Sequence, residues 1–70
     1  MDAQAQFGAT VRRLREAAGL TQEQLGALCD MDLSAISRLE RGHRNPRLDT
    51  LVRISRALEV PPAKLLEDVG

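Results

Sequence analysis

Arginine is the main basic residue of this 70-residue chain, and most of its arginines lie in one segment. Between Leu33 and Arg56 there are two acids and six arginines, at positions 38, 41, 44, 47, 53 and 56, for a net charge of +4. A planar guanidinium donates forked hydrogen bonds that suit phosphate groups and the edge of guanine. The whole chain is neutral, but a basic segment can still present a basic face to a polyanion. The preference for arginine over lysine can also reflect, in part, the base composition of the genome rather than a function.

The spacing of polar and apolar residues within this segment indicates a two-sided helix from about Leu33 to Arg41. At 100° per residue, two apolar side chains lie opposite four polar ones. The apolar pair is Ile36 and Leu39, and the polar set is Ser34, Ser37, Arg38 and Arg41. Such a helix can pack on a core with one side and enter the major groove of DNA with the other. Any small helical bundle shows a similar periodicity, so the pattern alone leaves DNA binding open.

Other chemistry has little support in the sequence. The single histidine, His43, and the single cysteine, Cys29, cannot form a conventional zinc site or an internal disulfide. No pair of titratable groups has the pattern of an acid–base or nucleophile–base pair. We therefore expect no enzyme, no cofactor, no metal and no small-molecule ligand. Cys29 is expected to be a buried apolar residue, with a redox switch as the lesser alternative, and His43 a surface spacer or a neighbour of phosphate.

Length and composition favour one small all-α domain that spans residues 1–70. The chain is 43% hydrophobic and has one Phe and neither Tyr nor Trp, whereas sheets favour aromatic residues. No apolar run approaches the ~20 residues of a membrane span, and the N-terminus lacks the pattern of a signal peptide. The cytoplasm is the expected compartment, and no membrane partner is expected.

Five short helices are predicted. In the first, Phe7, Val11, Leu14 and Ala18 share one face, and Gly19 ends the helix. Thr21 and Gln24 form a capping box for the second, whose predicted buried residues are Leu25 and Leu28. The segment from Asp30 to Asp32 is a tight break, and Asp32 caps the third helix. A fourth helix is predicted from about Leu48 to Leu58, with apolar positions Leu51, Ile54 and Leu58, and a fifth begins at Pro61-Pro62.

Gly26 supports close packing of the second and third helices. Glycine inside a helix costs about 1 kcal/mol relative to alanine. We expect the cost to be tolerated because a small residue lets the helix approach the turn that follows it.

Several motifs in order resemble the lambda-repressor-like (Xre/Cro) helix-turn-helix family. They are Leu20-Thr21-Gln22-Glu23-Gln24-Leu25, then Ile36-Ser37-Arg38-Leu39-Glu40-Arg41-Gly42, then Asn45-Pro46 and Leu48-Asp49-Thr50-Leu51. The resemblance covers about residues 7–67. It implies a five-helix fold whose helix-turn-helix spans residues 22–41, and a transcription regulator that binds a double-stranded DNA operator as a homodimer on an inverted repeat.

The resemblance also implies roles for individual residues. Positions that reach base edges in the family are occupied by Leu33, Ser34, Ala35 and Arg38, of which Arg38 is the candidate for reading guanine. Positions near the DNA backbone are occupied by Gln22, Ser37, Arg41, Arg44, Asn45 and Arg47. Arg15 and Glu40 match a structural salt bridge between the first and third helices.

Three positions depart from the family pattern. Asp30 stands where glycine is usual, and Asp can adopt the left-handed turn, but its carboxylate lies toward the DNA side. Leu33 stands where a polar residue is frequent in the family. We expect its side chain either to make an apolar contact with a base or to pack against the protein itself. Arg47 stands where serine often caps the fourth helix, so a cap is lost and a charge gained.

Dimerisation and subfamily are the least constrained features. Leu65, Leu66 and Val69, with parts of the fourth helix, are the expected dimer interface, although they can also close the monomer core. The stretch from Glu40 to Asn45 resembles restriction–modification controller proteins, and a small phage or plasmid repressor is the alternative. A protein-interaction module such as an antitoxin, or a piece of a longer regulator, are further alternatives.

Overall fold

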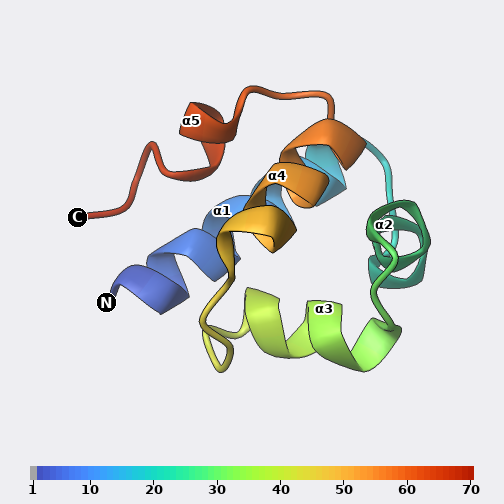
Figure 1. The fold of residues 1–70 in the computed structure, drawn as a ribbon, viewed down its shortest axis with the longest axis horizontal. Helices are drawn as coiled ribbons and strands as arrows, with labels where there is room; N and C mark the ends of the chain where they lie inside the picture. The colour runs from blue at the N-terminus through green and yellow to red at the C-terminus, as the bar shows by residue number, and fades with distance from the viewer. Residues whose placement is uncertain (1) are drawn as a thin grey trace.

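Five α-helices make up the fold of residues 2–70, the part of the chain that the computed structural model describes. They are α1 (Ala3–Ala17), α2 (Gln22–Cys29), α3 (Leu33–Glu40), α4 (Leu48–Ala57) and α5 (Pro62–Leu65). Within these residues there is no strand, which confirms the predicted all-α class. Figure 1 shows α4 over α1, with α2 to one side and α3 along the lower edge.

Side-chain and backbone caps set the helix ends at the predicted places. The Thr21 hydroxyl accepts from the Gln24 backbone N–H and the Gln24 side chain accepts from the Thr21 N–H, so the capping box is present. Asp30 ends α2 in a left-handed conformation with φ 59°. The Asp32 carboxylate accepts from the Ala35 N–H at 2.7 Å and starts α3. Arg47 precedes α4 and forms no side-chain cap, as its departure from serine predicts.

The core lies between the helices, where α3 packs against α1 and α2, and α4 packs against α2 and α5. Its buried apolar members are Phe7, Val11, Leu25, Cys29, Ile36, Leu39, Leu51, Ile54, Leu58 and Leu65. Burial raises the pKa of the Cys29 thiol because the thiolate would lose its hydration, so the thiol stays protonated and packs as an apolar group. The predicted core of α3 and α4 is therefore confirmed.

Leu28 is the clearest correction to the predicted core. Its side chain is 61% exposed, whereas Leu25, Gly26 and Cys29 form the buried side of α2. The reason lies at Gly26, which turns toward the segment after α2: a Cβ added there would lie 2.4 Å from the Met31 carbonyl oxygen. This approach rotates Leu28 outward, toward a hollow between α2 and α4 that Leu20 and Arg53 also line. Ala18, predicted on the buried side of the first helix, is likewise exposed because the helix ends there.

The C-terminal segment packs mainly on its own chain. Leu65 is 0% exposed and belongs to the monomer core, and Val69 is half-buried against it. Leu66, at 46% exposed, is the most open of the three residues expected at a dimer interface. Leu65 therefore follows the alternative in which it closes the monomer core, and an interface at Leu66 and Val69 stays a prediction. In the described part of the chain, no helix has both the length and the apolar character of a membrane span.

Candidate nucleic-acid interface

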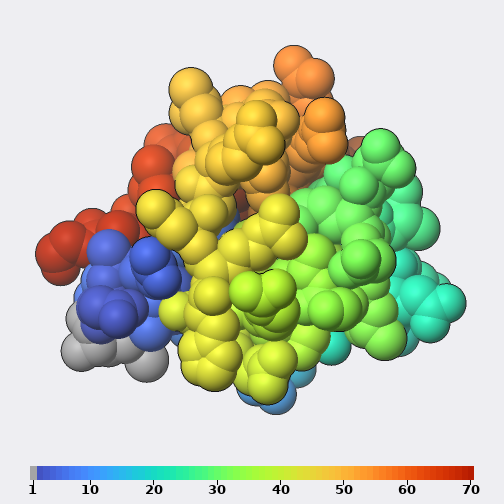
Figure 2. Space-filling model, turned by 60° about the horizontal axis from the view of Figure 1, so that its bottom comes forward, coloured from blue at the N-terminus to red at the C-terminus, as the bar shows by residue number. Residues whose placement is uncertain are grey.

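The helix pair α2–α3 presents one side of α3 to solvent. Ile36 and Leu39 are fully buried, while Ser34, Arg38 and Arg41 are exposed. Ala35 and Ser37 are half-buried on its flanks, and Leu33, at the start of the helix, is 49% exposed. Leu33 therefore does not pack fully on the protein, which leaves its side chain available for apolar contact. In Figure 2, α3 and the loop after it form the projecting front of the molecule.

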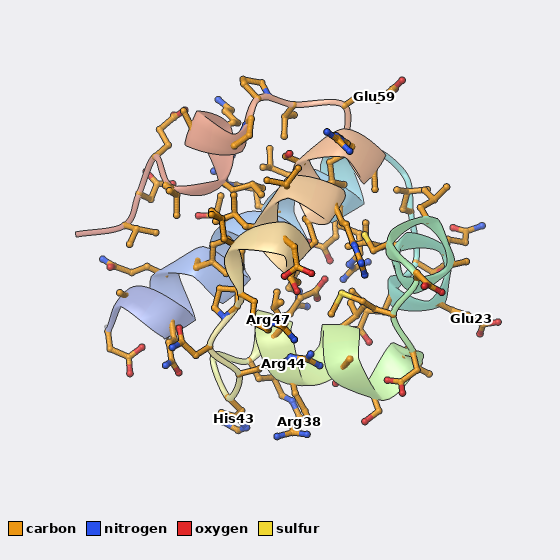
Figure 3. All side chains as sticks on the ribbon, in the orientation of Figure 1. Glu23, Arg38, His43, Arg44, Arg47 and Glu59 are labelled. Atoms are coloured by element: carbon orange, nitrogen blue, oxygen red, sulfur yellow. The ribbon has the colours of Figure 1, made fainter. Side chains whose placement is uncertain are left out.

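Arginine side chains collect on and beside this projecting surface. Arg38 comes from the last turn of α3 and Arg41 is its C-cap residue, while Arg44 and Arg47 come from the loop that leads to α4. Figure 3 shows Arg38 and His43 extending away from the core on the outer side of α3, with Arg44 and Arg47 near the same helix. Among the ion pairs of residues 2–70, none involves Arg38, Arg41 or Arg44. Their charges are therefore available to an external anion.

The acidic side chains divide between this surface and the rest of the molecule: Asp30 and Asp32 lie in the turn before α3, whereas Glu23 and Glu59 lie elsewhere. In Figure 3, Glu23 points outward from α2 and Glu59 lies at the end of the molecule opposite Arg38. Asp49 lies two residues after Arg47, and its carboxylate lies 3.7 Å from that arginine in an exposed ion pair. A neutral chain thus has a basic face, as the charge distribution along the sequence predicts.

A buried ion pair fixes the end of α3 to α1. The Arg15 Nε donates to Glu40 Oε2 at 2.6 Å and Arg15 Nη2 donates to Glu40 Oε1 at 3.0 Å. The hydrogen bond to Glu40 raises the pKa of Arg15 against the opposing effect of burial. A third hydrogen bond, from Arg15 Nη1 to the Leu20 carbonyl at 2.8 Å, ties the same guanidinium to the segment before α2. One arginine therefore holds three segments of the helix-turn-helix scaffold together.

Gln22 completes this arrangement from the start of α2. Its Nε2 donates to Glu40 Oε1 at 3.0 Å, and the residue is half-buried. An amide nitrogen carries two hydrogens, so one remains for a second acceptor. The N-terminus of α2 also offers free backbone N–H groups. Gln22 thus links the start of α2 to the end of α3 and keeps one amide hydrogen for a further acceptor.

The structure places the predicted DNA-contacting residues at the start of α2, on α3 and in the loop before α4, and it also reveals a contributor that the sequence analysis overlooked. Gly8 of α1 faces the end of α3, where an added Cβ would lie 2.4 Å from the Leu39 carbonyl oxygen and 2.6 Å from that of Glu40. This close approach is what brings Arg15 within reach of Glu40. A glycine in the middle of a predicted helix indicates close packing at that point, and Gly8 carries this signal as Gly26 does. No group of three or more metal-binding side chains occurs within residues 2–70.

The fold and this surface define a helix-turn-helix protein. The family model described as helix-turn-helix matches residues 11–65, and the chain belongs to that family. It is 44% identical over 62 residues to the control protein C.BamHI of Bacillus amyloliquefaciens. This match covers 87% of this chain and 76% of C.BamHI. It is 35% identical over 69 residues to the control protein C.MunI of Mycoplasma sp, covering 97% and 93% of the two chains.

Solved structures lead to the same class. The crystal structure of the restriction-modification controller protein C.AhdI from Aeromonas hydrophila superposes with a TM-score of 0.87 at 39% identity. The match covers 89% of this chain and 94% of that protein. The predicted resemblance to lambda-repressor-like regulators, and to controller proteins among them, is confirmed by these relatives.

Proposed function

We propose that this protein is a sequence-specific DNA-binding transcription regulator that inserts α3 into the major groove of its operator. The observation that carries the proposal is the exposed side of α3, where Arg38, and Arg41 at the C-cap, are exposed and form no ion pair within residues 2–70. The same helix is anchored at its other side by Ile36, Leu39 and Glu40. A rigidly held helix with free forked donors is what reading of base edges requires.

Individual roles follow from position on the surface. Arg38, exposed in the last turn of α3, is proposed to pair with O6 and N7 of a guanine, while Leu33, Ser34 and Ala35 contact neighbouring base edges. Contacts to the phosphates are proposed for residues at the rim, which supply affinity and salt dependence: Gln22, Ser37, Arg41, Arg44, Asn45 and Arg47.

The relatives suggest the biological setting. Several are named control or controller proteins, and C.AhdI and C.Esp1396I are named as controller proteins of restriction-modification. We propose that this chain likewise controls transcription in such a system, in the cytoplasm and without a cofactor. Two copies are proposed to bind an inverted repeat, because a two-fold dimer matches a palindromic operator.

Selection of bound duplexes from a random DNA library, at about 0.15 M salt to suppress phosphate-only binding, tests this function. The expected result is enrichment of an inverted repeat whose half-sites are about 10 bp, or a multiple of it, apart. Arg38→Ala, selected in parallel, is expected to lose the preference for one base pair in each half-site. Folded protein that enriches no sequence would overturn the proposal.

A second candidate is a protein-interaction module, such as an antitoxin whose toxin covers its surface. The hollow between α2 and α4 favours it, because the exposed Leu28 lies there beside Leu20 and Ala57. This function predicts a stable complex with a protein and no enriched DNA sequence in the same selection.

A further inference from the structure

His43 is the single histidine of the chain, and the end of α3 holds it beside the proposed DNA-reading surface. Its backbone N–H donates to the Arg38 carbonyl at 2.9 Å. Gly42, in the left-handed conformation with φ 76°, makes the turn that permits this bond. His43 is therefore fixed next to the last turn of α3. Figure 3 shows its ring and the Arg38 side chain extending away from the core on the same side of that helix.

The imidazole of His43 is exposed and is not engaged within its own chain. Among the hydrogen bonds and ion pairs of residues 2–70, none involves a ring nitrogen of His43. A neutral imidazole has one donor and one acceptor, whereas a protonated imidazole has two donors and a positive charge. An external anion is therefore a stronger partner for the protonated ring than for the neutral ring.

The charged side chains that α3 and the following loop bring near His43 are all basic. Arg38 lies in the last turn of α3, Arg41 is its C-cap residue, and Arg44 follows His43 directly. None of these three arginines forms an ion pair in the part of the chain that the structure describes. The acids of the turn before α3 lie at the opposite end of that helix. This end of the surface is therefore suited to a polyanion.

The start of α1 is the third element beside His43, and it brings one acid. A Cβ added to Gly42 would lie 2.8 Å from the Ala5 Cα, so the loop lies against the first turn of α1. Asp2 caps this turn, where its carboxylate accepts from the Ala5 N–H at 2.8 Å. No ion pair of residues 2–70 joins Asp2 to His43. The acid is thus engaged in capping α1 and leaves the imidazole open to an external anion.

We propose that His43 contacts a DNA phosphate as the imidazolium, so that this contact forms at mildly acidic pH and is lost as the pH rises. Histidine is the side chain that ordinarily changes its charge between about pH 5 and 8. A phosphate stabilises the protonated ring, so DNA binding takes up protons from solvent and the affinity falls with rising pH. The neighbouring arginines stay charged throughout this range. The inference rests on the proposed function and adds to it one contact that depends on pH.

Fluorescence anisotropy with a labelled duplex of arbitrary sequence tests the contact, because phosphate contacts do not depend on the bases. The wild type is expected to bind about fivefold more tightly at about pH 6 than at about pH 8. The slope of log affinity against log salt concentration is expected to be steeper by about 0.9 per bound copy at the lower pH. His43→Gln has no titratable ring and is expected to bind at both pH values as the wild type does at the higher one.

Two further variants separate charge from shape. His43→Lys keeps a cation throughout the range and is expected to bind at both pH values about as tightly as the wild type does at the lower one. Arg44→Gln removes a permanent charge from the same loop and serves as the matched control. It is expected to lower the affinity and the salt slope equally at both pH values and to keep the pH dependence of the wild type. Thermal denaturation establishes that each variant is folded.

The outcomes distinguish this contact from the proposed function. A wild-type affinity that is equal at the two pH values overturns the assignment of His43, and so does a pH dependence that His43→Gln retains. All variants share the other titratable groups of the chain, so the difference between wild type and His43→Gln isolates the imidazole. Binding that lacks this difference rejects the His43 contact alone. A folded wild-type chain that binds no duplex at about 50 mM salt overturns the proposed function as well.

Discussion

Arg15 of α1 and Glu40 of α3 form a two-point ion pair that is almost fully removed from solvent. Their side chains are 10% and 3% exposed, and the two contacts measure 2.6 and 3.0 Å. Replacing one partner of such a pair leaves a buried charge without compensation, which costs about 3 kcal/mol or more. The pair is therefore a vulnerable point of the scaffold that positions α3.

Glu40→Ala is the first prediction. We expect the free energy of unfolding to fall by about 3 kcal/mol, and the melting temperature of so small a domain by more than about 10 °C, because Arg15 is left buried and unpaired. Thermal denaturation followed by circular dichroism measures this. Glu16→Ala removes the acid of the exposed Arg12–Glu16 pair and is expected to cost about 0.5 kcal/mol or less. Equal effects of the two changes would contradict a special role for the buried pair.

Gln22 is predicted to act on affinity rather than on sequence preference. Gln22→Ala removes the hydrogen bond to Glu40 at 3.0 Å and the remaining amide hydrogen that is available to a phosphate. We expect about tenfold weaker binding to operator and to unrelated duplexes alike, with a loss of about 1 kcal/mol in folding stability. Fluorescence anisotropy on both duplexes separates these effects. A change confined to the operator would instead make Gln22 a reader of bases.

Arg38 is predicted to act on sequence preference. Arg38→Ala is expected to cost about 1–3 kcal/mol at one base pair of each half-site and to leave discrimination at other positions intact. Arg41→Ala, at the C-cap of α3, is the matched control. The Arg41 Nε already donates to the Ser37 carbonyl at 3.3 Å, so it is not free for a forked contact with a base. It is expected to weaken all sequences similarly and to reduce the salt dependence of binding. Competition with single-base operator variants measures both, and a uniform loss for Arg38→Ala would place it on the phosphates.

The sequence predicted the elements better than it predicted how they approach one another. Thr21, Asp32 and Gly19 mark helix ends through local hydrogen bonds and backbone conformation, which depend on neighbouring residues alone. The exposure of Leu28 depends on how far α2 rotates, and that rotation is set by the close approach of Gly26 to the Met31 carbonyl, which the periodicity of apolar residues does not predict. Gly8 was overlooked for the same reason: its role is visible only once α1 and α3 are side by side.

Gly26 provides a test of close packing at the helix-turn-helix itself. Gly26→Ala gains about 1 kcal/mol of helix propensity, but its methyl group would lie 2.4 Å from the Met31 carbonyl oxygen, which must move. We expect a net loss of about 1–2 kcal/mol in stability and a displaced α3 that binds the operator less well. Gly19→Ala is the control, since it has φ 74° and open space, and it strains the backbone by about 1 kcal/mol. At a temperature where the Gly19→Ala variant and the wild-type protein are both folded, the two should bind the operator with the same affinity.

Asp30 and Glu59 end α2 and α4 in the same left-handed conformation, with φ 59° and 58°, and so form a natural matched pair. Replacing either by glycine relieves backbone strain, removes one carboxylate and is expected to add about 0.5 kcal/mol of stability. The two positions differ in what lies beside them: Asp30 is in the turn before α3, whereas Glu59 lies far from Arg38 in Figure 3. A carboxylate near DNA repels phosphate over about a Debye length, so Asp30→Gly should tighten DNA binding about threefold or more at low salt, while Glu59→Gly should not. Equal affinities for the two variants would show that Asp30 faces away from the bound duplex.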